Sequence, residues 1–169
     1  MGDNTETAIL GGGCAWVLQQ LLRQPEGVVS TRTGFMGGAT ENPSEENSGD
    51  HAEVVEVVFD PQRLSFRGLL DVFFLVHRAD LGQGIVGSLY RSEIFVTSPE
   101  QRNVAEEMIR DVDASGHWPG RTVTRVSEAT VFWEMAPEGQ DYLLRFPRGC
   151  EPPFPPRPER SDDVSSIAG

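Results

Sequence analysis

The sequence predicts an α+β fold, a two-layer α/β sandwich in which helices pack on one mixed sheet. Segments with strand character alternate with segments of helical periodicity, and two consecutive strands close the series. Glycine-rich stretches between these segments predict long loops, the longest over residues 36–50. A chain of 169 residues with 38% hydrophobic residues can form one domain with a real core.

Each expected element has a local signal. Strands are predicted from short apolar or valine-rich runs at 7–10, 27–33, 53–59, 92–97, 122–126 and 129–133. Helices are predicted at 16–23, 65–77 and 98–113, and one helical turn at 140–144. Ser65 and Ser98 are suited to cap their helices, and Pro99 suits a first helical position. Residues 79–88 form a second glycine-rich loop.

Composition narrows the class of protein. The formal charge is −12, and all 14 basic residues are arginine, so the chain should repel nucleic acids and anionic membranes. No apolar run reaches the roughly 18 residues of a membrane span, and residues 1–6 lack the features of a signal peptide. We expect a cytoplasmic monomer with a disordered lead-in at 1–6, one domain at 7–150, and a proline-rich, disordered tail at 151–169.

The segment from Gly11 to Trp16 carries the clearest chemical signal. Three glycines allow a tight turn, and Cys14 follows them where the helix at 16–23 is about to begin. Unpaired N–H groups and the helix dipole favour a thiolate at such a place, and a thiolate is a nucleophile. The segment alone is equally compatible with an inert buried cysteine beside a loop.

Other motifs follow in order along the chain: Gly34-Phe35-Met36-Gly37-Gly38, Asn42-Pro43, His51-Ala52-Glu53-Val54-Val55, Phe59-Asp60-Pro61 and Tyr90-Arg91-Ser92. Together with Gly13-Cys14-Ala15-Trp16, this series resembles the peptide methionine sulfoxide reductase A family over residues 8–150. The resemblance implies a ferredoxin-like core within the sandwich. It also implies thiol-dependent reduction of methionine S-sulfoxide, free or in proteins, without metal or organic cofactor.

The resemblance assigns a role to each motif residue. Cys14 matches the nucleophile, which becomes a sulfenic acid, and Glu53 matches the acid, whose pKa burial should raise. Tyr90 matches a tyrosine that helps bind the sulfoxide oxygen, and Trp16 matches the wall that packs the S-methyl group. Cys150 matches the resolving cysteine that forms a disulfide with Cys14, which a dithiol such as thioredoxin then reduces. Each residue also has a simpler structural interpretation, such as core packing or a solvated loop.

The sequence departs from the family around the substrate. Phe35 replaces a tyrosine and Ala15 replaces a phenylalanine, which predicts a less polar pocket that is wider at Ala15. Gln19 stands where a glutamate is usual, and Ile85 stands where the family has an aspartate, for which Asp80 is a possible substitute. His51 could orient the substrate loop or simply lie at the surface.

Three alternatives follow from these departures: a bulkier or small-molecule sulfoxide as substrate, loss of turnover, or a non-catalytic role in binding a partner or sensing oxidant. Other chemistries lack support. No hydrolase signature surrounds Cys14, cysteines with metal-ligand spacing are missing, and a phosphate loop would need a lysine. Retention of Cys14, Glu53 and Cys150 favours an active sulfoxide reductase.

Overall fold

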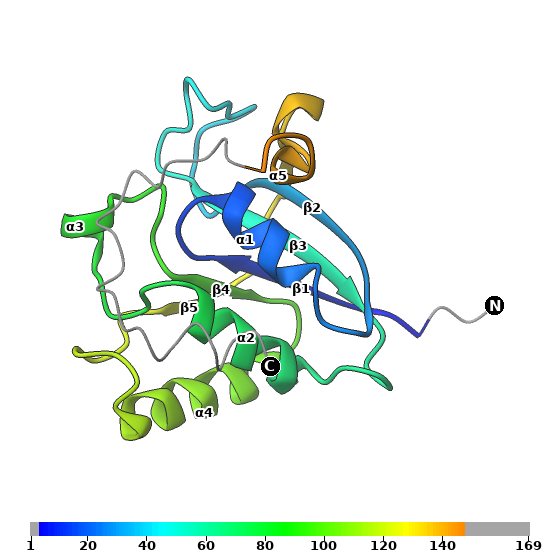
Figure 1. Cartoon of the computed structure of the whole chain (residues 1–169). Helices are drawn as coiled ribbons and strands as arrows, with labels where there is room; N and C mark the ends of the chain where they lie inside the picture. Colours follow the sequence, from blue (N-terminus) through cyan, green and yellow to red (C-terminus); the bar gives the residue numbers. More distant parts are fainter. Residues whose placement is uncertain (1–3, 148–169) are drawn as a thin grey trace.

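The structure of the protein, a computed structural model, describes residues 4–147 and builds them around one six-stranded mixed sheet (Figure 1). The strand order is β5-β4-β1-β3-β2-β6, with β4 and β5 parallel and every other pair antiparallel. The strands are β1 (Glu6–Gly11), β2 (Val28–Met36), β3 (Ala52–Phe59), β4 (Glu93–Val96), β5 (Arg125–Glu128) and β6 (Trp133–Glu134). The predicted α+β class is confirmed.

The helices are α1 (Ala15–Leu22), α2 (Phe66–Val76), α3 (Gln83–Val86), α4 (Pro99–Ser115) and α5 (Tyr142–Arg145), with a 3₁₀ turn at Pro137–Gly139. Helices α1, α2 and α4 begin within one residue of their predicted starts, and α5 begins two residues later than the predicted helical turn. The Oγ of Ser65 accepts from the N–H of Gly68 at 2.9 Å, and the Oγ of Ser98 accepts from the N–H of Gln101 at 3.1 Å. Both serines therefore cap their helices as expected.

Alternation along the strands divides the core into two parts. On one face, Ala8, Leu10, Val55 and Val57 pack under α1, α2 and α4 in the main apolar cluster. The intervening residues point to the other face, where a smaller cluster contains Ile9, Met36, Ala52, Val54 and Phe95. Ala129 and Phe132 pack on this smaller cluster.

The two last predicted strands are wrong in position. We expected strands at 122–126 and 129–133, but β5 and β6 lie at Arg125–Glu128 and Trp133–Glu134. These strands occupy opposite edges of the sheet, so the chain between them must cross it. Ala129 and Phe132 are apolar because they cover the second core cluster during this crossing, and not because they alternate along a strand.

Two further details complete the fold. The second glycine-rich loop, predicted without regular structure, contains the short helix α3. Among residues 4–147, every helix is too short or too polar to cross a lipid bilayer.

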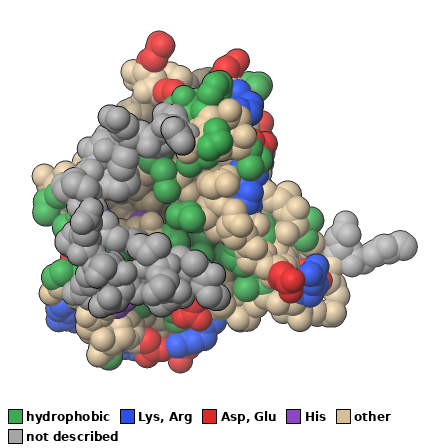
Figure 2. Space-filling view, viewed as in Figure 1, with side chains coloured by type: hydrophobic (Ala, Val, Ile, Leu, Met, Phe, Trp, Pro, Cys, Tyr) green, Lys and Arg blue, Asp and Glu red, His purple; other side chains and the backbone are tan. Residues whose placement is uncertain are grey.

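Acidic side chains stand out along the upper edge of Figure 2, consistent with the strong negative charge of the chain.

Candidate active site around Cys14

Cys14 is the N-cap residue of α1. It follows β1, which is one of the two central strands of the sheet. Its carbonyl oxygen accepts the first helical hydrogen bond, from the N–H of Leu18 at 3.0 Å. The backbone of Cys14 is extended (φ −68°, ψ 125°), and its residue surface is 7% exposed. The structure thus confirms the predicted place of the cysteine at a helix N-terminus, the positive end of the helix dipole.

The glycines before Cys14 are required by close packing. A Cβ atom on Gly12 would lie 2.7 Å from Cδ2 of the His77 ring, which is closer than real Cβ atoms approach. Gly13 has φ +78°, in the left-handed region that favours glycine, and its N–H donates to the carbonyl of Tyr90 at 3.2 Å. This bond places the backbone of Tyr90 beside the cysteine loop, the residues from Gly12 to Cys14 that connect β1 and α1. The Tyr90 side chain is half-buried.

Glu53 lies beside Cys14 because its carboxylate holds the first turn of α1. Its Oε1 accepts from the backbone N–H of Ala15 at 2.9 Å, and the residue is only 8% exposed. Its own N–H donates to the carbonyl of Leu89 at 2.9 Å, which fixes the start of β3 against the loop that leads to Tyr90. One hydrogen bond therefore brings the predicted acid to the residue after the predicted nucleophile.

The surroundings of Glu53 keep a proton on it near neutrality. Burial raises its pKa from 4.5 to about 7, although the hydrogen bond from Ala15 favours the charged form. Repulsion from the carboxylate of Glu45 adds to the rise. The sequence predicted this direction, and the pKa of about 7 suits a group that donates a proton at physiological pH.

Glu45 offers a test of this electrostatic environment. The Glu45→Gln variant removes the repulsion and should lower the pKa of Glu53, so the rate of methionine formation should begin to fall at a lower pH than in the unmodified protein. The measurement is the pH profile of methionine formation. Glu46→Gln is the matched control, because Glu46 does not contribute to the pKa of Glu53. An equal shift in both variants, or in neither, contradicts the assignment.

Phe35 and Ala15 border the site from the core. Phe35 lies opposite Glu53 in the register of β2 and β3, and is 1% exposed. The side chain of Ala15 has no exposed surface and belongs to the main core cluster. The structure therefore shows no open space at the Ala15 methyl group, where we expected a wider pocket; Ala15 reaches the site through its N–H.

Trp16 packs on an aromatic residue that the sequence did not reveal. Its ring stacks on that of Tyr142 in α5, with centroids 3.9 Å apart and planes inclined by 11°. The ring of Phe146 also contacts Tyr142, with centroids 5.0 Å apart and planes inclined by 40°. The contact joins the N-terminal and C-terminal parts of the described chain, and no periodicity in the sequence could have indicated it.

His51 is buried and supports the loop before β3. Its Nδ1 accepts from the N–H of Gly38 at 3.0 Å, so Nε2 carries the proton and donates to the carbonyl of Thr40 at 2.7 Å. The residue is 1% exposed. Of the two roles considered for His51, the structure gives it the orienting one: both ring nitrogens are used within the loop between β2 and β3.

Arg91 connects the loop before β3 with the loop before β4, a role that sequence reasoning missed. This buried guanidinium forms an ion pair of 2.6 Å with the buried Glu93. Its NH1 atom also donates to the carbonyl of Asp50 at 3.1 Å and to that of Ser88 at 2.8 Å. The only sequence signal was its place in the Tyr90-Arg91-Ser92 motif.

Ile85 and Asp80 do not supply a carboxylate to the site. Ile85 is 59% exposed in α3. The carboxylate of Asp80 binds the Arg78 guanidinium through two hydrogen bonds of 2.8 Å, and this contact lowers the pKa of Asp80. Asp80 also accepts from the N–H of Gly120. Its carboxylate is thus fully used in bracing a loop.

The described residues bear on metal binding but do not include the second cysteine. Within residues 4–147 there is no cluster of three His, Cys, Asp or Glu side chains suited to a metal ion. Cys150, the predicted resolving cysteine, lies outside the described residues, as does the predicted tail.

Comparisons with known proteins point to one family. A family model described as peptide methionine sulfoxide reductase matches residues 6–160. The chain is 51% identical over 157 residues to the peptide methionine sulfoxide reductase MsrA of Nocardia farcinica, covering 90% of this chain and 92% of that protein. It is 50% identical over 153 residues to MsrA 1 of Mesorhizobium japonicum, covering 88% of each.

Solved structures agree with this result. Methionine sulfoxide reductase A of Corynebacterium diphtheriae is similar with a TM-score of 0.76 and 30% identity, over 90% of this chain and 80% of that one. Reduced Mxr1 from Saccharomyces cerevisiae has the same fold, with a TM-score of 0.76 at 22% identity, over 94% of this chain and 95% of that one.

Proposed function

The chain belongs to the peptide methionine sulfoxide reductase family, and we propose that Cys14 is the nucleophile with which it reduces methionine S-sulfoxide, with Glu53 as the acid. The observation that carries the proposal is the hydrogen bond of 2.9 Å between the Ala15 N–H and Oε1 of Glu53. It sets a carboxyl group with a pKa of about 7 beside the cysteine at the N-cap of α1.

The first half of the reaction is an oxygen transfer. The Cys14 thiolate attacks the sulfoxide sulfur and forms a transient bond to it, and Glu53 gives its proton to the sulfoxide oxygen. The S–O bond of the substrate then breaks as the hydroxyl passes to the Cys14 sulfur, and the bond between the two sulfurs breaks to release methionine. Overall, one thiol and one sulfoxide yield one sulfenic acid on Cys14 and methionine. The methionine sulfur gains two electrons and the Cys14 sulfur loses two. We assign Tyr90 to hold the sulfoxide oxygen, and Trp16 and Phe35 to pack the S-methyl group.

The second half restores the thiols. The Cys150 thiolate attacks the sulfenic sulfur of Cys14, the S–O bond breaks, and the oxygen leaves as water. The resulting disulfide is exchanged with an external dithiol, for which we propose thioredoxin. No resident cofactor takes part in these steps. We also propose that the protein works as a monomer in the cytoplasm.

The Cys150→Ser variant tests the second half. It should lose turnover supported by thioredoxin, thioredoxin reductase and NADPH, because its sulfenic acid cannot become a disulfide. It should still form methionine once per protein, and it should turn over with dithiothreitol, which can reduce a sulfenic acid directly. Turnover is measured as methionine by mass spectrometry, beside the unmodified protein. Undiminished turnover with thioredoxin contradicts the role of Cys150.

A further inference from the structure

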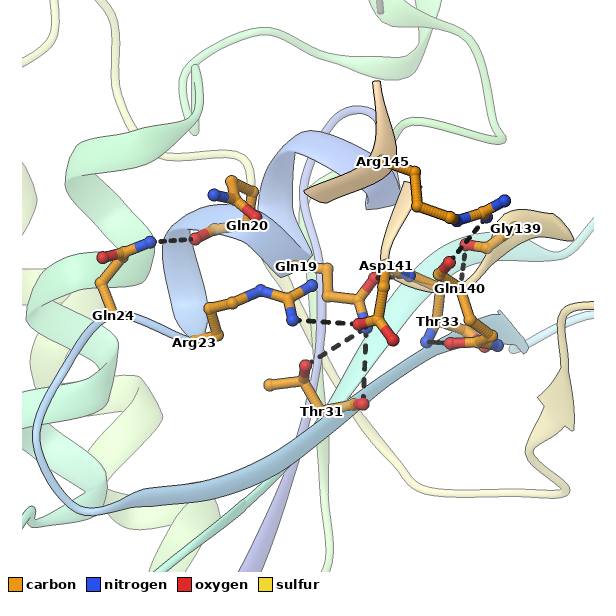
Figure 3. Close-up of polar contacts among 10 residues, drawn as sticks. All are labelled: Gln19, Gln20, Arg23, Gln24, Thr31, Thr33, Gly139, Gln140, Asp141 and Arg145. Atoms are coloured by element: carbon orange, nitrogen blue, oxygen red, sulfur yellow. Dashed lines mark hydrogen bonds and ion pairs between the residues drawn. The ribbon is translucent and has the colours of Figure 1, made fainter. Parts of the chain in front are cut away.

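We propose that Gln19 and Gln140 are positioning residues for the recycling step: they clamp residues 136–146 so that Cys150 approaches Cys14 from a fixed point. The inference rests on the proposed function, since it takes Cys150 as the resolving thiol. The clamp consists of the polar contacts of Gln19, Arg23 and Gln140 in Figure 3, which connect α1 and β2 with the segment that ends in α5.

Gln19 holds this segment from α1. It is 1% exposed, and its Oε1 accepts from the N–H of Asp141 at 3.0 Å. Its Nε2 donates to Oγ1 of Thr31 at 3.2 Å, and lies 3.4 Å from both the Thr31 carbonyl and Oδ1 of Asp141. Arg23, one turn later in α1, donates to the same Oδ1 at 2.9 Å. Both ends of the Gln19 amide are thus used in joining α1, β2 and Asp141.

Gln140 lies within the segment and attaches it to β2. Its Oε1 accepts from the N–H of Thr33 and its Nε2 donates to the carbonyl of Thr33, both at 2.8 Å (Figure 3). These are the two bonds that a neighbouring strand would make to β2. The side-chain amide therefore continues the pairing along the edge of β2, past the end of β6. The hydroxyl of Thr33 also donates to the carbonyl of Gly139 at 2.8 Å.

The clamp holds the backbone of Asp141 in an uncommon conformation. Asp141 has φ +53° and ψ +32°, a left-handed conformation that non-glycine residues adopt only when their surroundings over-determine it. Gln19 holds its N–H, and Gln19 and Arg23 hold its carboxylate. α5 begins at the next residue, Tyr142, which stacks on Trp16 two positions after Cys14. The clamp therefore fixes α5 beside the cysteine loop.

Chain length connects the clamp to the disulfide. From Arg145, the end of α5, to Cys150 there are five residues, which span at most about 17 Å. If the clamp opens, the tether starts near the buried Met135 instead, and its length grows to fifteen residues. Effective concentration falls with about the −3/2 power of tether length, so disulfide formation should slow about fivefold.

The clamp also gives Gln19 a reason to differ from glutamate. A carboxylate at this position has no N–H to donate to Thr31 or Asp141, and it would be repelled by the Asp141 carboxylate. Gln19→Glu is therefore a nearly isosteric change that opens the clamp. Gln24→Glu is the matched control, because Gln24 is exposed and its side chain donates only to the carbonyl of Gln20 (Figure 3). Gln140→Ala opens the clamp from the β2 side.

The test separates the two halves of a single turnover. The reduced full-length protein is mixed with excess methionine S-sulfoxide without reductant and quenched at intervals. Methionine is measured by mass spectrometry, the Cys14 sulfenic acid by dimedone trapping, and the Cys14–Cys150 disulfide by peptide mass. In Gln19→Glu and Gln140→Ala, disulfide formation should slow about fivefold and trapped sulfenic acid should increase, while methionine formation should slow much less, by no more than the displacement of Tyr142 from Trp16 causes. Gln24→Glu should behave as the unmodified protein.

Each contrary outcome has a distinct meaning. Disulfide formation at the unmodified rate in Gln19→Glu and Gln140→Ala overturns the clamp while leaving the proposed function intact. Equal slowing of methionine and disulfide formation also overturns it, because the contacts would then support the site as a whole. If the unmodified protein forms methionine but no Cys14–Cys150 disulfide, the assignment of Cys150 fails first, and the inference falls with it.

Discussion

Replacing Cys14 by serine is expected to lower the rate of methionine formation by roughly 10⁴-fold or more, the scale seen when a catalytic nucleophile is removed. A hydroxyl at neutral pH is a far weaker nucleophile than a thiolate, and it cannot form a sulfenic acid. Methionine is measured by mass spectrometry with dithiothreitol as reductant, so that the recycling step does not limit the comparison.

The Cys14→Ser variant should remain folded, which makes the loss interpretable. Serine is a favoured N-cap residue, and the Cys14 side chain makes no capping hydrogen bond that the change would remove. Its thermal unfolding midpoint should equal or exceed that of the unmodified protein. Methionine formation near the unmodified rate in a folded Cys14→Ser protein would remove Cys14 from the mechanism.

The Glu53→Gln variant should lose about 10²- to 10⁴-fold in the rate of methionine formation, the usual contribution of a general acid. The amide oxygen of glutamine can still accept from the Ala15 N–H, so the geometry of the first turn of α1 is kept. In the unmodified protein, the rate should fall as the pH rises past about 7, where Glu53 loses its proton. The variant should lack this limb of the pH profile.

The same variant should change stability in a defined pH range. The pKa of Glu53 is about 7 in the folded state against 4.5 as the ordinary value, so the folded state holds its proton more tightly. The ionisation of Glu53 therefore leaves the free energy of unfolding unchanged below pH 4.5 and lowers it progressively up to about pH 7. Above that pH the loss of stability reaches a plateau of at most about 3 kcal/mol.

Urea unfolding at two pH values measures this cost. Relative to the unmodified protein, Glu53→Gln should gain stability at pH 8 and show no such gain at pH 4. Equal differences at both pH values would show that the carboxyl group is not held protonated by its surroundings. Undiminished methionine formation in the variant would remove Glu53 as the acid, whatever its stability.

Local signals predicted most of the fold. Ser98 and Pro99 marked the start of α4, and the helix continues two residues beyond the predicted end, to Ser115, because Gly116 supplies a left-handed C-cap (φ +66°). The strands near residue 130 could not be predicted in the same way. β5 is a short, partly exposed edge strand. The apolar residues that follow it, Ala129 and Phe132, pack on the smaller core cluster on the second face of the sheet.

The site divides along similar lines. Cys14 and Glu53 could be singled out from the sequence, Cys14 by a glycine turn before a helix together with the family resemblance, and Glu53 by its place in a motif that resembles the family. Gln140 and Tyr142 could not, because they act through contacts with residues more than 100 positions away. The burial of the Ala15 methyl group was also hidden from the sequence, since only the packing of α1 on the sheet determines it.

The most direct test of the account is the stoichiometry of one turnover. The reduced protein is mixed with an excess of stereochemically pure methionine S-sulfoxide without reductant, and the methionine formed is counted per protein chain. We expect one methionine per chain, the loss of two thiols, and no methionine from the R epimer. Absence of methionine from the folded, reduced protein, or methionine formed without oxidation of Cys14, would contradict a sulfoxide reductase that works through this cysteine.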